Sequence, residues 1–234
     1  MTEIKVLDHG YVKLVSSMGT DETIIEAARM STGKGFQGWG DEAKYGDEKL
    51  LKFLWDNKHA TPFEMCELHI EVMAPIFVFR EWHRHRTQTY NEMSARYTPL
   101  PDINYIPSVE RLMVNAKTGN KQAGTVAGAV DLTEEKAEAF RRGLAEIYAR
   151  DEGFYQEALL GGVPKELARV HLPVGRYSKM RAKTDLRNWL GFLTLRMAPG
   201  AQWEIRMYAN AVAEIVKELW PRTYALFAAK KEGA

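Results

Sequence analysis

Arginine, histidine and glutamate side chains gather between residues 80 and 97. The stretch reads Arg80-Glu-Trp-His-Arg-His-Arg86 and then Thr-Gln-Thr-Tyr-Asn-Glu-Met-Ser-Ala-Arg-Tyr97. From residue 80 to residue 96 it holds four Arg and two Glu, a local charge of +2 with His neutral. Planar guanidinium groups match the geometry of phosphate, and the dense polar side chains of residues 90–97 suit a small polar ligand better than a core. The segment therefore predicts a binding site for a phosphorylated ligand.

Charge alone would also fit a solvated basic helix end. At helical spacing Arg80 and Arg84 share one face, so we expect these arginines to pair with acids or to hold an anion. The polar residues that follow favour the ligand site over the solvated helix end.

Two other kinds of site are disfavoured. Four histidines invite a metal hypothesis, because imidazole is a common ligand of zinc and iron: His59, His69, His83 and His85. The last two stand two residues apart, and a helix points such residues roughly opposite ways, so we expect no metal site. Nucleic-acid binding is disfavoured because 32 Lys+Arg face 31 Asp+Glu, without a basic surplus.

Length and composition narrow the class of protein. A chain of 234 residues makes one large domain or two small ones. Its single cysteine, Cys66, excludes a disulfide scaffold and a thiolate zinc site, which fits a reducing compartment. No signal peptide and no apolar run of membrane-spanning length is visible. We therefore expect a soluble, cytoplasmic protein without membrane contact.

Apolar spacing predicts strands and helices in alternation. Residues 4–16 alternate around Asp8-His9-Gly10 as a hairpin does, and Leu68–Met73 alternates as a half-buried strand. Three-to-four-residue spacing predicts helices over 21–30, 47–57, 75–86, 133–159, 164–171, 184–197 and 202–219. The glycine-rich segment 31–46 and the segment 98–132 are predicted as loops, and Pro221 as the end of the last helix.

These elements predict an α+β fold. The expected order is strand, helix, helix, strand, helix, strand and then several helices, without internal repeats. This gives a single domain over residues 1–234, with a small mixed or antiparallel sheet flanked by helices and a helical C-terminal half.

One signature makes the sequence similar to a known family. Arg84-His85-Arg86, seven further residues and then Ser94 resemble the motif of the flavin-dependent thymidylate synthases (the ThyX family). Other blocks resemble the same family: HATPFE at 59–64, APIFVFREW at 74–82, ARVHLP at 168–173, LRNWLGFLTLR at 186–196 and AQWEI at 201–205. The resemblance spans most of the chain, thins in the glycine-rich loop and in 108–132, and implies that family's fold.

The resemblance implies an enzyme. The family converts deoxyuridine monophosphate (dUMP) to thymidylate (dTMP), with a one-carbon unit from methylenetetrahydrofolate and hydride from FAD, which NADPH recharges. It also implies a homotetramer whose active sites form between subunits. By motif position, FAD would meet Arg84, His85, Arg86, Thr61, Glu92, Asp185 and Arg187. His59 would lie near the flavin ring, and Ser31 is a further candidate for this cofactor.

On the nucleotide side the resemblance implies a longer set of residues: Glu81, Trp82, His83, Arg84, Glu92, Met93, Ser94, Ala95, Arg96, Arg169 and Arg196. Arg96 and Arg169 could fork a phosphate. Arg196 would sit against the uracil edge and stabilise negative charge on the pyrimidine, so we expect it to be catalytic.

Neither hydroxyl nor thiol is expected to act as the nucleophile. Ser94 lacks an evident neighbouring base, which favours a ligand-binding hydroxyl, and Cys66 lacks an activating His or Arg cluster, which favours packing. Three positions depart from some relatives: Glu81 stands where Gln occurs, and Asp185 and Gly191 stand where Asn occurs.

Overall fold

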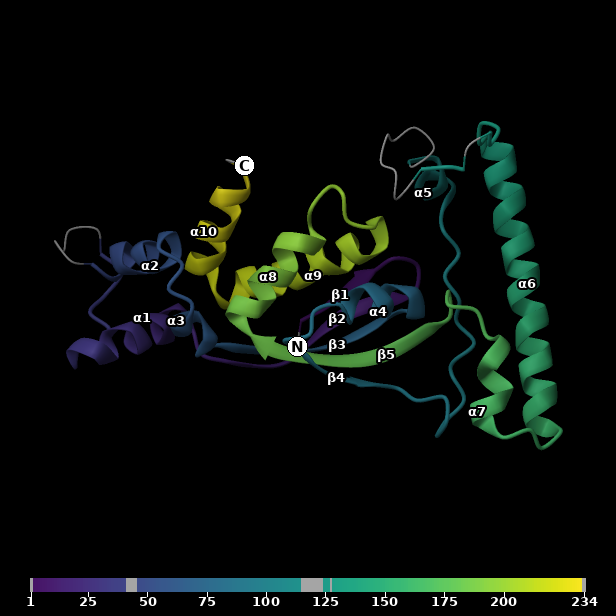
Figure 1. Ribbon diagram of the computed structural model, residues 1–234, viewed down its shortest axis with the longest axis horizontal. Helices are drawn as coiled ribbons and strands as arrows, with labels where there is room; N and C mark the ends of the chain where they lie inside the picture. The colour runs from purple at the N-terminus through teal and green to yellow at the C-terminus, as the bar shows by residue number, and fades with distance from the viewer. Residues whose placement is uncertain (1, 41–45, 115–123, 127, 233–234) are drawn as a thin grey trace.

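A five-stranded antiparallel sheet forms the centre of the molecule (Figure 1). Its strands are β1 (Glu3–Val6), β2 (Gly10–Met18), β3 (Glu67–Pro75), β4 (Thr89–Glu92) and β5 (Tyr177–Asp185). The order across the sheet is β1-β2-β3-β5-β4, so β5 separates two strands that precede it in the chain. The computed structural model describes residues 2–40, 46–114, 124–126 and 128–232.

The predicted α+β architecture is confirmed, and of the mixed or antiparallel sheet that was expected the structure has the antiparallel one. β1 and β2 form the expected hairpin, with Val6 opposite Gly10. In β3 the side chains of Leu68, Ile70 and Val72 are fully buried, because strand residues two apart point to the same face of a sheet.

Helices cover one face of the sheet and both of its ends. The helices are α1 (Asp21–Arg29), α2 (Asp47–Asp56), α3 (Thr61–Glu64), α4 (Ile76–Trp82), α5 (Val109–Val114), α6 (Glu134–Leu160), α7 (Lys165–Ala168), α8 (Leu186–Arg196), α9 (Trp203–Leu219) and α10 (Pro221–Glu232). In Figure 1, α4, α8 and α9 lie over one face, α1 to α3 at one end, and α6 and α7 at the other.

Aromatic rings hold the three covering helices together. Trp82 of α4 packs on Phe192 of α8 with ring centroids 4.7 Å apart, and Trp189 and Tyr208 also meet the Trp82 ring edge-on. The Trp189 indole nitrogen donates to the carbonyl of Leu68 in β3 at 3.0 Å. These contacts fix the end of α4 against the C-terminal half of the chain.

The predicted helix over 75–86 is wrong in its last four residues. The helix ends at Trp82, and the Tyr90 hydroxyl lies 3.1 Å from the Trp82 carbonyl and 2.8 Å from the His85 carbonyl. A side chain thus satisfies carbonyls that a continuing helix would bond from its own backbone. Residues 83–88 form turns instead.

Other boundaries also differ from the sequence prediction. The helix expected over 184–197 begins at Leu186, because Thr184 and Asp185 still belong to β5. Pro221 separates two helices and starts α10, which was not expected. In the predicted loops, α5 occupies Val109–Val114, while 41–45, 115–123 and 127 lie outside the described residues.

Candidate functional site

Two arginines face one cavity beside the end of α4. The cavity has a volume of about 350 Å³, and Arg80, Glu92, Ser94, Arg169 and Ser178 contribute to its lining. Within the described residues neither Arg80 nor Arg169 has a hydrogen-bond or ion-pair partner for its side chain, and the buried Ser178 hydroxyl has none either. Unpaired guanidinium groups and a free hydroxyl are groups that suit an anion.

The turn after α4 separates its basic residues into two directions. Arg84 and Arg86 are exposed, and among the described residues their guanidinium groups have no acidic partner. His85 between them is half-buried, and its ring meets the Phe192 ring edge-on at 4.8 Å. The turn therefore exposes the guanidinium groups of Arg84 and Arg86 to solvent and directs the His85 imidazole toward the interior.

Arg196, the last residue of α8, reaches this turn. Its Nη1 donates to Glu81 Oε2 at 2.7 Å and its Nη2 to the Glu81 carbonyl at 2.9 Å. Its Nε donates to His85 Nε2 at 2.9 Å. The fold thus brings together three residues that the sequence predicted for the site from two distant blocks.

His85 is neutral in this arrangement. Burial of its ring, followed by the positive charge of Arg196, lowers its pKa to about 4, against an opposing effect of Glu81. Because Nε2 accepts from Arg196, the ring proton resides on Nδ1. The imidazole therefore orients the guanidinium without adding a second positive charge.

Arg96 and Arg169, which we expect to fork a phosphate, line different cavities in this structure. Arg169 lines the 350 Å³ cavity, whereas Arg96 Nε donates to Glu166 Oε2 at 3.1 Å and lines a neighbouring cavity with Lys165. Arg80 takes the second place beside Arg169. Arg80 was not among the residues predicted for the site, although the spacing of four residues between Arg80 and Arg84 was a usable signal.

Two of the predicted nucleotide residues have buried side chains. Trp82 is fully buried and donates from its indole nitrogen to Gln88 Oε1 at 2.9 Å, and Ala95 is also buried. The main-chain amide of Met93 is bonded to the Lys179 carbonyl at 2.8 Å, and the His83 ring lies against Met180 and Tyr90. Direct contact of Trp82 with a ligand is therefore left to its main chain.

The residues predicted for the flavin lie partly on other elements. Thr61 begins α3, and His59 precedes it with its ring 5.5 Å from that of Phe53. Arg187 in the first turn of α8 pairs with Glu64 of α3 at 3.4 Å. Ser31 lies in the 3-10 turn after α1, where its hydroxyl donates to the Ala28 carbonyl at 3.1 Å.

Asp185, predicted as a flavin residue, also bonds the first turn of α8. Its Oδ1 accepts from the amide of Asn188 at 2.8 Å and its Oδ2 from the Asn188 side chain at 2.6 Å. It is therefore the N-cap of α8. Gly191 lies three residues after Asn188 on α8, and a Cβ added to it would meet nothing within 4 Å.

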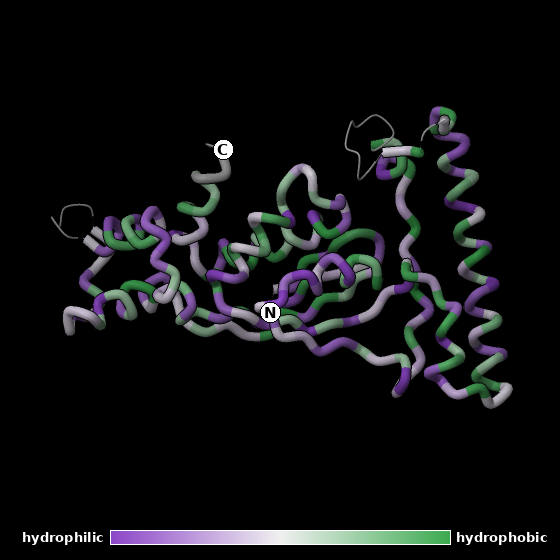
Figure 2. The backbone as a smooth tube through the Cα atoms, in the orientation of Figure 1, coloured by the Kyte–Doolittle hydropathy of each residue, from purple (hydrophilic) through white to green (hydrophobic). Residues whose placement is uncertain are grey.

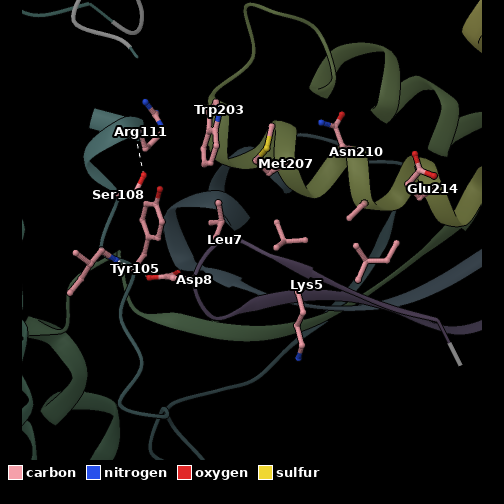
Figure 3. Close-up of a pocket in the computed structure, with 14 residues that line it drawn as sticks. Lys5, Leu7, Asp8, Tyr105, Ser108, Arg111, Trp203, Met207, Asn210 and Glu214 are labelled. Carbon is pink, nitrogen blue, oxygen red and sulfur yellow. Dashed lines mark hydrogen bonds between the residues drawn. The ribbon is translucent and has the colours of Figure 1, made fainter. Parts of the chain in front are cut away.

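A second cavity, of about 620 Å³, lies between β1, the segment 105–111 and α9 (Figure 3). It contains none of the residues predicted for the site. Its arginine, Arg111, pairs with the buried Glu204 at 2.7 Å and stacks over Trp203, while Lys5 pairs with Glu3 at 2.8 Å. Because both cations are neutralised, this cavity does not attract an anion as the first one does.

Other chemical groups add little to the site. Burial raises the pKa of the Cys66 thiol to about 11, so a thiolate is scarce at neutral pH. In the described ranges, no three His, Cys, Asp or Glu side chains come together in a way that could hold a metal ion. None of the helices described there combines the length and apolar character needed to cross a membrane.

Comparisons with known proteins agree on one family. The family model described as "Thymidylate synthase complementing protein" matches residues 13–222. A flavin-dependent thymidylate synthase of Thermus thermophilus is 44% identical over 224 residues, which cover 96% of this chain and 77% of that protein. One of Anaplasma marginale is 40% identical over 225 residues, covering 96% and 74%.

Solved structures give the same result for the fold. A crystal structure of the UMP/dUMP methylase PolB from Streptomyces cacaoi, bound with 5-Br dUMP, matches with a TM-score of 0.80 at 31% identity. The match covers 97% of each chain. A second structure of that protein, bound with 5-Br UMP, has a TM-score of 0.81 at 30% identity.

Proposed function

Because the chain belongs to the family of flavin-dependent thymidylate synthases, we propose that it methylates dUMP to dTMP, with methylenetetrahydrofolate as carbon donor, FAD as hydride carrier and NADPH as reductant. The family membership makes it a methyltransferase. The observation that carries the substrate assignment is the cavity with two unpaired arginines, Arg80 and Arg169, next to the Arg196 cluster.

The phosphate of the nucleotide would bind in the 350 Å³ cavity. Arg80 and Arg169 supply charge there, and Ser94 and Ser178 supply hydroxyl groups. Both hydroxyls act as ligands in this proposal, since no base among the described residues lies within hydrogen-bond distance of Ser94 Oγ. Arg80 and Glu81 are neighbours on α4, and Glu81 bonds Arg196, which supports a phosphate end of the site close to Arg196.

The free arginines of the turn fit the cofactor. The pyrophosphate of FAD needs cationic partners, and the exposed guanidinium groups of Arg84 and Arg86 have no acid bound to them in the described part of the chain. Thr61 and Arg187 stand where α3 packs against the start of α8. These residues would bind and orient the cofactor.

Arg196 is the residue that we assign to the chemical step. Its plane is fixed by His85 and by the Glu81 carbonyl, so its charge is aimed before substrate arrives. A permanently charged guanidinium against the uracil edge stabilises negative charge on the ring, which makes the carbon to be methylated more nucleophilic. No thiolate takes part in this proposal, in keeping with the raised pKa of Cys66.

We further propose that the chain folds as one domain over 1–234 and acts as a cytoplasmic homotetramer with active sites between subunits. Its solvent-accessible surface is 13695 Å², whereas a monomer of 26.7 kDa averages about 10,700 Å². The excess surface supports burial against further copies.

Spectroscopy and turnover test the function. The purified protein should show the visible absorbance of a flavin, which bleaches with NADPH when dUMP is present, and it should release tritium from ring-labelled dUMP. UMP belongs in the same assay, because a similar structure is that of a UMP/dUMP methylase. A colourless protein that neither takes up FAD nor releases tritium would overturn the proposal.

Substitution of Arg196 separates catalysis from cofactor binding. Arg196→Ala should keep its flavin but lose methylation by a factor of about 100 or more, since removing one preorganised charge-stabilising donor costs on that order. Tritium release by the flavin-loaded variant measures the loss. Arg206→Ala is the matched control, because within the described residues the Arg206 side chain, in the first turn of α9, bonds only the Pro199 carbonyl. Near-normal turnover of Arg196→Ala would show that another residue performs the step.

A further inference from the structure

Arg196 has two neutral partners and one charged partner. The His85 ring and the Glu81 carbonyl each accept at 2.9 Å. The Glu81 carboxylate accepts at 2.7 Å, and in the described part of the chain it is the ion-pair partner of this guanidinium. The neutral acceptors fix the plane of the group, while the carboxylate cancels its charge.

The charged partner is also the one that is free to move. The Arg196 side chain is 16% exposed and the Glu81 side chain 44%. The Glu81 carbonyl belongs to the backbone of α4, and the His85 ring is packed on Phe192, so both are held more firmly than the carboxylate. The carboxylate needs only a change of rotamer to release Nη1.

A paired Arg196 does not suit the role assigned to it. A carboxylate 2.7 Å from the guanidinium opposes the field that would stabilise negative charge on the pyrimidine. Carbonyl oxygens of the pyrimidine and carboxylate oxygens are both acceptors and compete for the same N–H groups. The N–H of Nη1 that is bonded to Glu81 is therefore closed to the nucleotide while the carboxylate stays in place.

We propose that Glu81 is a positioning residue whose carboxylate occupies Arg196 in the resting enzyme and leaves it when the pyrimidine nucleotide binds. This inference rests on the proposed function. Each binding event breaks the ion pair, so Glu81 weakens nucleotide binding and does not change the turnover of bound nucleotide. The departing carboxylate moves to solvent, which its exposed position allows.

Glu81→Gln tests this with the flavin-loaded enzyme. Glutamine keeps the length and an acceptor oxygen, but it removes the negative charge of the carboxylate, so the ion pair with Arg196 becomes a weaker hydrogen bond to a neutral acceptor. The KM and the calorimetric Kd for dUMP should fall about three- to tenfold with kcat within about twofold of the wild type. Glu81→Asp keeps the charge but retracts it by one methylene. Its KM and Kd for dUMP should lie between those of the wild type and those of Glu81→Gln.

Asp56→Asn is the matched control. It removes the carboxylate of an exposed pair with Lys52 on α2, and its kinetic constants should equal those of the wild type. A higher KM in Glu81→Gln would mean that the carboxylate contacts bound nucleotide. An unchanged KM would mean that the ion pair is incidental, and a lower kcat would mean that Glu81 acts during the reaction. Each of these outcomes overturns the inference. A wild type that neither binds nor turns over dUMP overturns the proposed function, and the inference with it.

Discussion

The arginines of this chain differ in their partners. Arg176 is buried and bound to Glu152, and the half-buried Arg111 is bound to the buried Glu204, so both arginines hold elements together. Four others have no acidic partner among the described residues and stand at the predicted site: Arg80, Arg84, Arg86 and Arg169. A buried charge must be paired to be tolerated, whereas a free one near the surface remains available to a ligand.

At the same scale, His85 should make the stability depend on pH. Its pKa in the folded protein is about 4, whereas the unfolded chain takes up the proton near pH 6.5. Between these values the unfolded state binds more protons, so the free energy of unfolding falls as the pH falls. Urea unfolding at pH 6.5, 5.5 and 4.5 should show a shallower decline for His85→Gln than for the wild type.

Other groups titrate in the same range, and they contribute equally to both proteins. The comparison therefore isolates the His85 contribution. Parallel declines in the two proteins would show that His85 gains its proton as readily in the folded state as in the unfolded chain.

At the scale of elements, the end of α4 determines how the site is built. Residues 83–86 would present their side chains in a regular rotation if the helix continued. Because Trp82 is locked in the core and Tyr90 bonds the carbonyls of Trp82 and His85, the chain turns there. His85 can then face Arg196 while Arg84 and Arg86 remain exposed.

The docking of α9 on the sheet depends on Gly10. A Cβ at this position would lie 2.0 Å from the Tyr208 hydroxyl and 2.7 Å from the Met73 carbonyl, and these two groups bond each other at 2.8 Å. Gly10→Ala should lower the free energy of unfolding by about 1–3 kcal/mol, the range for overpacked cores. Urea denaturation measures the change.

Gly143→Ala provides the control for that substitution. An added Cβ meets nothing within 4 Å at this position of α6, and alanine favours a helix by about 1 kcal/mol over glycine. The control should be as stable as the wild type or more so. If Gly10→Ala has the same free energy of unfolding as the wild type, α9 shifts to make room for the methyl group without loss of stability.

At the scale of the whole molecule, α6 has an exposed apolar face. Phe140, Ile147 and Phe154 stand seven residues apart and are all exposed, a spacing that aligns side chains along one face of a helix. Figure 2 shows hydrophobic residues recurring along α6, at the end of the molecule remote from α1 and α2. This face is our candidate for contact with another copy of the chain.

Light scattering of the eluting protein should therefore give a mass about four times that of the 26.7 kDa chain. The double substitution Phe140→Glu and Phe154→Glu should reduce this mass, because charges are costly in an apolar interface. It should also reduce the flavin content, since we propose that the sites form between subunits. Ala149→Glu, an exposed change on another side of α6, should leave both values unchanged; an undiminished mass of the double variant would place the interface elsewhere.

The sequence by itself determined the family, the α+β fold, the β1–β2 hairpin and the helices α1, α2, α6 and α9. Motif spacing and local apolar periodicity are properties of neighbouring residues, so they can be read along the chain. It did not locate β5, whose buried positions include only Met180 and Ala182 as apolar residues between Ser178 and Thr184. That strand is defined by pairing with β3 and β4 rather than by its own pattern.

Only the tertiary structure decided which arginine side chains are paired with acids and which have no acidic partner among the described residues. Arg196 meets Glu81 and His85 across 115 and 111 residues of sequence, and Arg96 turns to Glu166 while Arg80 joins Arg169. Each of these pairings depends on how helices and strands pack, which no local spacing specifies. The sequence therefore determined which residues could do the chemistry, and the packing of α4, β4 and α8 decided which of them face the same space, because contacts between distant segments exist only in the folded chain.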